Sequence, residues 1–217
     1  MVQAIETFID LDFGIRGDVV PADHGYGLFG AACRVLPWLH ADEGVGVHRI
    51  GGRLVGGRTL ALTPASRLTL RLAASRIHEA LPLSGQVLDI DGATVQVGVP
   101  TVRPLVPAPS LLSRLVVIKG FQEAETFLEA ARRQAEALGL EGRLALVGRE
   151  HEGSVEGATV RAAGEPIRRT LRVRDKVVVG FALAATELTA DESLRLQEAG
   201  IGGRRRFGCG LFAPWRG

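Results

Sequence analysis

The spacing of apolar residues switches along the chain between a period of two, typical of strands, and a period near 3.6, typical of helices. Apolar positions among acidic residues predict a first strand over residues 2–14, although the alternation slips once. A helix follows, with Asp23 as its expected N-cap and Pro37 as its stop. The same reasoning predicts strands at 46–53, 58–63 and 66–72, a helix at 75–81, and a hairpin of 87–90 with 94–97 that turns at Asp91-Gly92.

Prolines crowd between residues 100 and 109, and a segment so stiff and so poor in N–H donors predicts an extended linker. We therefore expect a first domain at residues 1–103 and a second at 104–217. Beyond the linker we predict strands at 111–119, 143–149, 168–174 and 177–186, helices at 123–138 and 190–199, a mobile loop at 150–166 and a last strand from 207. Two βαββαβ units in tandem predict an α+β fold of two ferredoxin-like (RRM-like) domains with a C-terminal glycine-rich loop.

The composition is that of a globular protein, with 46% hydrophobic residues among 217. The formal net charge is only +2, so affinity for a nucleic acid would have to come from local basic clusters. Cys33 and Cys209 are too far apart to suggest a disulfide framework. No apolar run approaches the ~20 residues of a membrane span, and no basic region followed by an apolar core opens the sequence. These features predict a cytoplasmic protein that does not bind a membrane.

The first basic cluster lies in a glycine-rich segment from Gly200 to Gly210. Glycines allow backbone conformations with positive φ and a close approach of another backbone, while consecutive arginines bring positive charge to the same loop. A tight turn with a solvated basic tip is the alternative interpretation. We expect the loop to hold phosphates through Gly202, Gly203, Arg204, Arg205 and Arg206.

The second basic cluster is the predicted strand at 168–174. The period of two places Arg168, Arg172 and Arg174 on one face, roughly 7 Å apart, which suits successive phosphates of an RNA backbone. Arg169 and Lys176 add charge beside this face. An exposed edge strand that uses charge against aggregation is the alternative. Aromatic residues make up only 5% of the chain, so recognition by serial base stacking is poorly supported.

The histidines are the candidate acid–base groups. A metal-free RNA cleavage needs a base for the 2′-OH, an acid for the leaving 5′-oxygen and a cation for the phosphorane, and histidine can be base or acid near neutral pH. His24 stands at the start of the first predicted helix near Tyr26, and His40 lies just beyond that helix, roughly 20 Å away. His48 opens the next strand and could return toward His40. No histidine or cysteine spacing is typical of a metal site.

Taken together, these segments resemble those of the CRISPR repeat-processing endoribonucleases of the RAMP superfamily, and within it the Myxan-type branch. The superfamily's glycine loop has two Gly-apolar-Gly units separated by five residues, and Gly200-Ile201-Gly202 and Gly208-Cys209-Gly210 match it. The other segments that carry the resemblance are 20–26, His40, 47–50, 66–68, 113–120 and 168–172.

The resemblance implies a metal-independent endoribonuclease, without a cofactor, that cuts precursor CRISPR RNA within its repeats. Attack of a 2′-OH would leave 5′-hydroxyl and 2′,3′-cyclic phosphate ends. Relatives place a histidine either after the first helix or near its start, so we rank His40 first, His24 with Tyr26 second and His48 third. Lys119 is the expected cation for the phosphorane. The expected partner is CRISPR repeat RNA, precursor and mature, and association with other subunits of a type I effector complex is compatible with this function.

Two other functions compete with this interpretation. A non-catalytic RNA-binding subunit of an effector complex would have the same fold and the same basic loop, but it would not need a reactive histidine. A small-molecule enzyme or regulatory ferredoxin-like domain would show no salt-dependent affinity for RNA.

Overall fold

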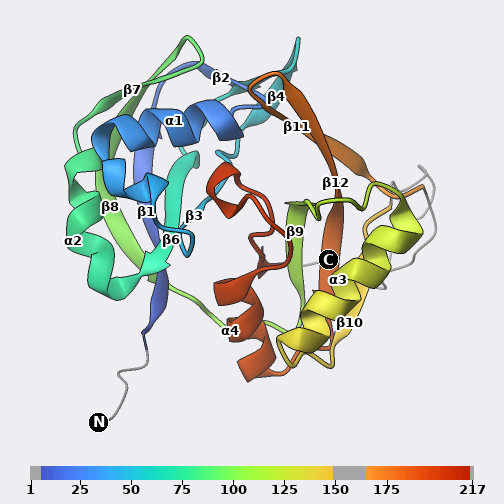
Figure 1. Ribbon diagram of the computed structural model, residues 1–217. Coiled ribbons are helices and arrows are strands. Elements are labelled where there is room, and N and C mark those ends of the chain that lie inside the picture. Colours follow the sequence, from blue (N-terminus) through green and yellow to red (C-terminus); the bar gives the residue numbers. More distant parts are fainter. Residues whose placement is uncertain (1–5, 149–164, 216–217) are drawn as a thin grey trace. The chain divides into compact units, whose positions relative to one another are not determined.

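The computed structural model describes residues 6–148 and 165–215 (Figure 1). The predicted loop at 150–166 lies almost wholly outside the described residues. The chain forms two compact units. The first comprises residues 1–105 together with Arg205–Gly208, and the second comprises residues 106–204 together with Cys209–Gly217. None of the described helices is long and apolar enough to cross a membrane.

The first unit has an antiparallel sheet with the strand order β3-β6-β1-β8-β7. Its first four strands follow the ferredoxin-like order, and β7 is added at the edge. A separate small sheet has the order β2-β5-β4. The elements are β1 Phe8–Arg16, β2 Val19–Pro21, α1 Gly25–Val35, η1 Pro37–His40, β3 Gly46–Val47, β4 Arg53–Gly56, β5 Thr59–Ala61, β6 Arg67–Ala73, η2 Ala74–Arg76, α2 Ile77–Ala80, η3 Leu81–Leu83, β7 Val87–Ile90 and β8 Ala93–Pro104.

The core of this unit lies between the sheet and its helices, α1 and α2, which Figure 1 shows in blue and green. Alternation along β1 buries Leu11 and Phe13 against Leu28 of α1, because successive side chains of a strand point to opposite faces. The intervening residues Asp10 and Asp12 therefore point to the face of the sheet away from the helices. This alternation positions the ionic cluster described below.

Several predicted boundaries in the first unit differ from the structure. Helix α1 begins at Gly25 with His24 as the N-cap residue, so the predicted cap at Asp23 is wrong. The predicted helix at 75–81 is a single α-helical turn between 3-10 turns. Pro100 and Pro104 lie in β8 and not in a linker. Both prolines are tolerated because β7 pairs with β8 only over Ala93–Gln96, so this end of β8 needs no donors on that side.

The second unit repeats the ferredoxin-like order as β10-β12-β9-β13, and β11 pairs with β12. A capping box of Thr189 and Glu192 starts α4, as the sequence predicts. The predicted last strand is present as β13, but it begins at Ala213 and not at residue 207, because Gly208 and Gly210 take positive φ values of 81° and 66° that interrupt extended backbone. The elements are β9 Leu111–Val116, α3 Ala124–Ala137, β10 Arg143–Leu146, β11 Arg168–Val173, β12 Lys176–Thr186, α4 Ala190–Ala199 and β13 Ala213–Pro214.

Candidate active site

His40 is an exposed imidazole held at the end of a short, well-packed turn. Pro37 opens the 3-10 turn η1 directly after α1, and Leu39 within the turn is fully buried. The backbone at His40 is therefore fixed while its side chain remains at the surface. The imidazole stacks on Phe29 of α1, with a distance of 6.2 Å between ring centroids and an angle of 25° between ring planes.

The 3-10 turn η4, Arg205–Phe207, brings residues of the glycine-rich segment to this part of the first unit. Phe207 packs edge-on against Tyr26 and Phe29, with centroid distances of 5.5 and 5.3 Å. The guanidinium carbon of Arg206 lies 5.5 Å from the Phe29 ring centroid, and Nη1 donates a hydrogen bond to the backbone carbonyl of His40. We call Tyr26, Phe29, His40, Arg206 and Phe207 the His40 cluster.

The charge of Arg206 also affects the pKa of a neighbouring side chain of α1, Cys33. Burial raises the pKa of the Cys33 thiol, and the positive charge of Arg206 partly offsets this effect. The Arg206 guanidinium therefore lies close to two side chains of α1, Phe29 and Cys33.

His24 is fully buried and both of its ring nitrogens are engaged. The backbone N–H of Ile50 donates to Nε2 at 2.9 Å, so Nδ1 carries the proton and donates to the carbonyl of Pro21 at 2.7 Å. Burial lowers the pKa of His24 from 6.5 to about 4, although the hydrogen bond to Pro21 opposes the shift. This geometry argues against His24 as a catalytic base, because neither nitrogen is available to an RNA.

A buried ionic cluster occupies the sheet face away from the helices. The register sets Asp10 of β1 opposite Arg71 of β6 and Arg103 of β8. Arg71 donates from Nε and Nη2 to the two carboxylate oxygens of Asp10, at 2.8 and 3.0 Å. His48 Nε2 lies 3.5 Å from Asp10 Oδ1, and Arg103 joins Asp10 to Asp12 through contacts of 3.2 and 2.8 Å.

Electrostatics within this cluster keep Asp10 ionised. Burial alone would raise the pKa of Asp10, but hydrogen bonds and positive charges from His48 and Arg71 outweigh it and hold the pKa well below its usual value. Burial lowers the pKa of His48, and the hydrogen bond with Asp10 opposes that shift. His48 is therefore part of a structural ionic cluster, with about 20% of its side chain exposed.

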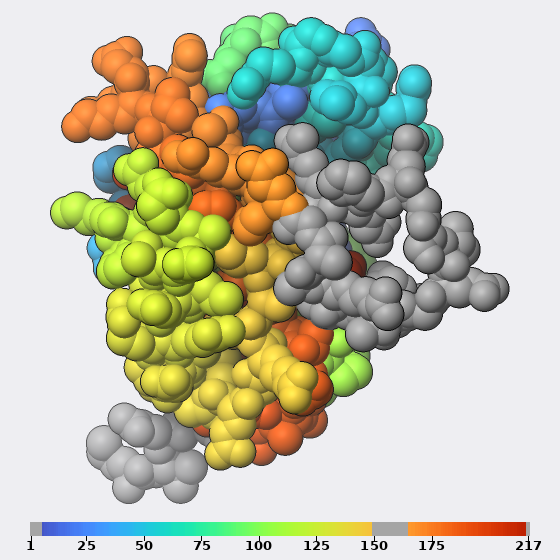
Figure 2. Space-filling view, turned by 90° about the vertical axis from the view of Figure 1, so that its right-hand side faces the viewer, coloured from blue at the N-terminus to red at the C-terminus, as the bar shows by residue number. Residues whose placement is uncertain are grey.

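The β11–β12 hairpin presents the predicted basic strand at the surface, in orange in Figure 2. Arg168, Thr170 and Arg172 are exposed on one face while Leu171 is fully buried on the other, as the period of two predicts. Arg169 is partly buried. The strand ends at Val173, so the predicted strand position of Arg174 is wrong: Arg174 lies in the hairpin turn with a φ of 54°, and exposed Lys176 begins β12.

The glycine loop is fastened to the second unit by backbone hydrogen bonds. The N–H of Gly203 donates to the carbonyl of Val117 at 2.9 Å, and that of Gly210 donates to the carbonyl of Leu115 at 2.8 Å. The N–H of Gly202 donates to Gln134 Oε1 of α3 at 2.8 Å. These hydrogen bonds hold the loop on both sides of the arginine triplet.

The arginines of the triplet have different surroundings. Arg204 is exposed in the second unit, with a φ of 65°. Arg205 is half-buried in the first unit, where burial and the nearby charge of Arg71 lower its pKa to about 10. Arg206 belongs to the His40 cluster. Lys119 is exposed in the second unit, before a turn at Gly120 with a φ of 89°.

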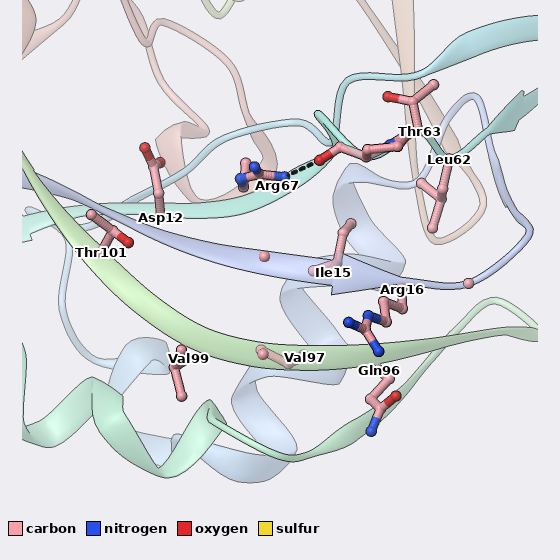
Figure 3. Close-up of a pocket in the computed structure, with 14 residues that line it drawn as sticks. Asp12, Ile15, Arg16, Leu62, Thr63, Arg67, Gln96, Val97, Val99 and Thr101 are labelled. Carbon is pink, nitrogen blue, oxygen red and sulfur yellow. Dashed lines mark hydrogen bonds between the residues drawn. The ribbon is translucent and has the colours of Figure 1, made fainter.

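An open groove of about 990 Å³ lies in the first unit, along β1 and β8. Figure 3 shows Asp12 and Thr101 toward one end and Arg16 and Gln96 toward the other. Arg67 beside the groove donates to the carbonyl of Pro64 at 2.7 Å. None of the residues predicted for catalysis or RNA binding lines this groove.

Within residues 6–148 and 165–215, no three histidine, cysteine, aspartate or glutamate side chains gather in a way that could hold a metal ion.

A family model described as Cas6 Crispr matches residues 9–217 of the chain. The chain belongs to the Cas6 family. A curated relative, the CRISPR-associated endonuclease Cas6 of Myxococcus xanthus, is 40% identical over 208 residues, which cover 96% of this chain and 82% of the relative. The family resemblance predicted from the glycine loop and the other segments is thereby confirmed.

Solved structures support the same Cas6 fold. A CRISPR-associated protein Cas6 superimposes with a TM-score of 0.66 at 10% identity, covering 96% of this chain and all of that one. A RAMP protein described as binding different RNA substrates gives a TM-score of 0.64 at 12% identity, again covering 96% of this chain and all of that one. Together with the strand orders, these similarities confirm the predicted α+β fold of tandem ferredoxin-like domains.

In this Cas6-family chain the predicted site residues fall into separate groups. His40 contacts Arg206, which was predicted only as an RNA contact, and Tyr26 packs against the next residue, Phe207. His48 joins the ionic cluster, and Lys119 belongs to the other unit. Sequence reasoning missed Phe29, Phe207 and the Asp10 cluster. The alternating acids of β1 were a signal for the ionic cluster, but their partners depend on the strand register.

Proposed function

We propose that this chain cleaves precursor CRISPR RNA within its repeats by a metal-independent reaction, with His40 as an acid–base group. Support comes from the Myxococcus xanthus relative, which is a CRISPR-associated endonuclease, and from the structural relative described as binding RNA. The observation that carries the proposal is an exposed histidine on a fixed turn, hydrogen-bonded through its backbone to an arginine.

The proposed reaction is an internal transesterification. A base removes the 2′-OH proton, O2′ forms a bond to the adjacent phosphorus, and the bond from phosphorus to O5′ breaks. An acid returns a proton to O5′, so the products are a 2′,3′-cyclic phosphate and a 5′-hydroxyl. His40 supplies one of these proton transfers, and an imidazole suits either one near neutral pH. Of the candidate histidines, His40 is the exposed one, whereas His24 and His48 are held in internal contacts.

RNA is held by phosphate contacts in this proposal. The exposed face of β11 offers Arg168 and Arg172, and the turn after it offers Arg174. Arg204 adds an exposed charge on the glycine loop. Contacts to phosphates carry affinity without base specificity, so we expect binding to weaken strongly with salt. The function places the protein in the cytoplasm with its RNA, and retention of the cleaved product would allow assembly with other effector subunits.

The test is cleavage of an end-labelled repeat RNA in EDTA, followed by analysis of the product ends. We expect 2′,3′-cyclic phosphate and 5′-hydroxyl ends, and no cleavage of an RNA with a 2′-deoxy nucleotide at the scissile position. His40→Ala should lower the cleavage rate by about 10²–10⁴-fold with unchanged RNA affinity in filter binding. His78→Ala, which changes an exposed histidine on α2, is the matched control.

Other results would redirect the proposal. Full activity of His40→Ala would remove His40 from the mechanism. A wild-type protein that binds the repeat RNA and never cuts it would instead be a non-catalytic RNA-binding subunit. Activity that disappears in EDTA and returns with a divalent cation would exclude the metal-independent reaction.

A further inference from the structure

We propose that Arg206 is the cation that stabilises the phosphorane in the cleavage reaction at His40. This inference rests on the proposed function and replaces Lys119 in that role. The glycine-rich segment would then take part in catalysis as well as in RNA binding.

The first support is the way that Arg206 is held. Nη1 donates to the backbone carbonyl of His40, and the guanidinium carbon lies 5.5 Å from the centroid of the Phe29 ring, on which the His40 imidazole also stacks. Phe207, the next residue, is wedged against Tyr26 and Phe29. These contacts fix the guanidinium against the His40 backbone and the Phe29 ring before any RNA arrives, which is the preorganisation that electrostatic catalysis requires.

The second support is the donor capacity that remains. Arg206 is half-exposed, and within the described parts of the chain its hydrogen bond to His40 uses only Nη1. Nε and Nη2 form one edge of the planar guanidinium, a fork that matches two oxygens of a phosphate. An arginine remains charged throughout the reaction, so it can stabilise the growing negative charge without exchanging a proton.

The other cations near this sequence segment have different surroundings. Arg205 is half-buried beside Arg71, and Arg204 is exposed in the second unit. Lys119 also belongs to the second unit. Among these side chains, Arg206 is the one that directly contacts His40, through the backbone carbonyl of that residue.

Single-turnover cleavage at saturating RNA separates catalysis from binding. Removing a preorganised donor to a developing oxyanion lowers the rate by about 10²–10³-fold. We expect Arg206→Ala to show such a loss with at most a threefold change in Kd. Arg53→Ala, at an exposed arginine of β4 in the same unit, is the matched control, and it should change neither Kd nor the rate at saturation. Arg206→Lys should keep part of the rate, because it keeps the charge and loses the planar fork.

Chemical rescue distinguishes a catalytic cation from a residue that only positions His40. Added guanidinium ion, at concentrations that leave wild-type activity unchanged, should raise the rate of Arg206→Ala. Thermal unfolding of each variant shows whether the fold is intact. If Arg206→Ala folds and cleaves at the wild-type rate, the inference is overturned. If the variant cleaves slowly and guanidinium does not raise its rate, the inference is overturned as well. Both results would leave the proposed function standing. Absence of cleavage by the wild type would refute both this inference and the proposed function.

Discussion

Acidifying the protein should lower its free energy of unfolding through His24. The folded state keeps this ring neutral, because the Ile50 N–H donates to Nε2 and the ring is fully buried. The unfolded chain takes up the proton near its ordinary pKa of 6.5, whereas the folded chain takes it up only near pH 4. Between these values the unfolded state binds more protons, so stability falls as pH falls.

The magnitude follows from the two pKa values. Their difference corresponds to about 3 kcal/mol of stability, lost fully only below the folded pKa. On going from about pH 7.5 to about pH 5 the loss is about 2 kcal/mol. Urea unfolding at these two pH values measures it directly.

The decisive comparison is with His24→Gln, which has no titrating ring. Other groups, His48 among them, titrate in both proteins and cancel in the comparison. The wild type should therefore lose about 2 kcal/mol more than His24→Gln over this range. His78→Gln, at an exposed site, should behave like the wild type. Equal pH dependence of His24→Gln and the wild type would refute the reasoning and reopen the catalytic alternative for His24.

Further predictions concern the ionic cluster, the glycine loop and the basic strand. Arg71→Met should cost about 3–5 kcal/mol in urea unfolding, because Asp10 is left buried without its bidentate partner, and a loss below about 1 kcal/mol would contradict this. Gly210→Ala should lower stability by at least about 1 kcal/mol in thermal unfolding, because φ is 66° and a Cβ would lie 2.3 Å from the carbonyl oxygen of Ile201. An unchanged Tm would argue against this backbone conformation at Gly210. Arg172→Ala should reduce the slope of log K against log salt concentration for RNA binding by roughly one phosphate contact, and it should leave the cleavage rate at saturation unchanged. An unchanged slope would show that Arg172 does not contact the RNA.

Local sequence signals predicted the elements whose causes are local. The turn at Asp91-Gly92 is where it was expected, between β7 and β8, because both residues take the positive φ that such a hairpin turn requires. The capping box also predicted the start of α4 correctly, because Thr189 and its partner Glu192 are only three residues apart. The prolines of β8 misled the prediction, because whether a strand can hold proline depends on which of its edges is paired.

The environments of the candidate site residues depend on contacts that no local pattern contains. His24 was interpreted as an available base, but its Nε2 accepts from Ile50, 26 residues away. Arg206 and His40 are 166 residues apart, and their contact could be found only once the fold was known. Residue types identified the chemistry of the site, whereas the pairing of those residues required the structure.

Residues 205–208 belong to the first unit although they follow residues 106–204 in the chain. A ribosome therefore makes His40, Phe29 and all of β9 to α4 before it adds Arg206 and Phe207. Domains generally fold in order as they leave the ribosome, so the first sheet and α1 can form long before the last members of the His40 cluster exist. A nascent or prematurely terminated chain would carry the histidine without its arginine, and only full synthesis would complete the cluster.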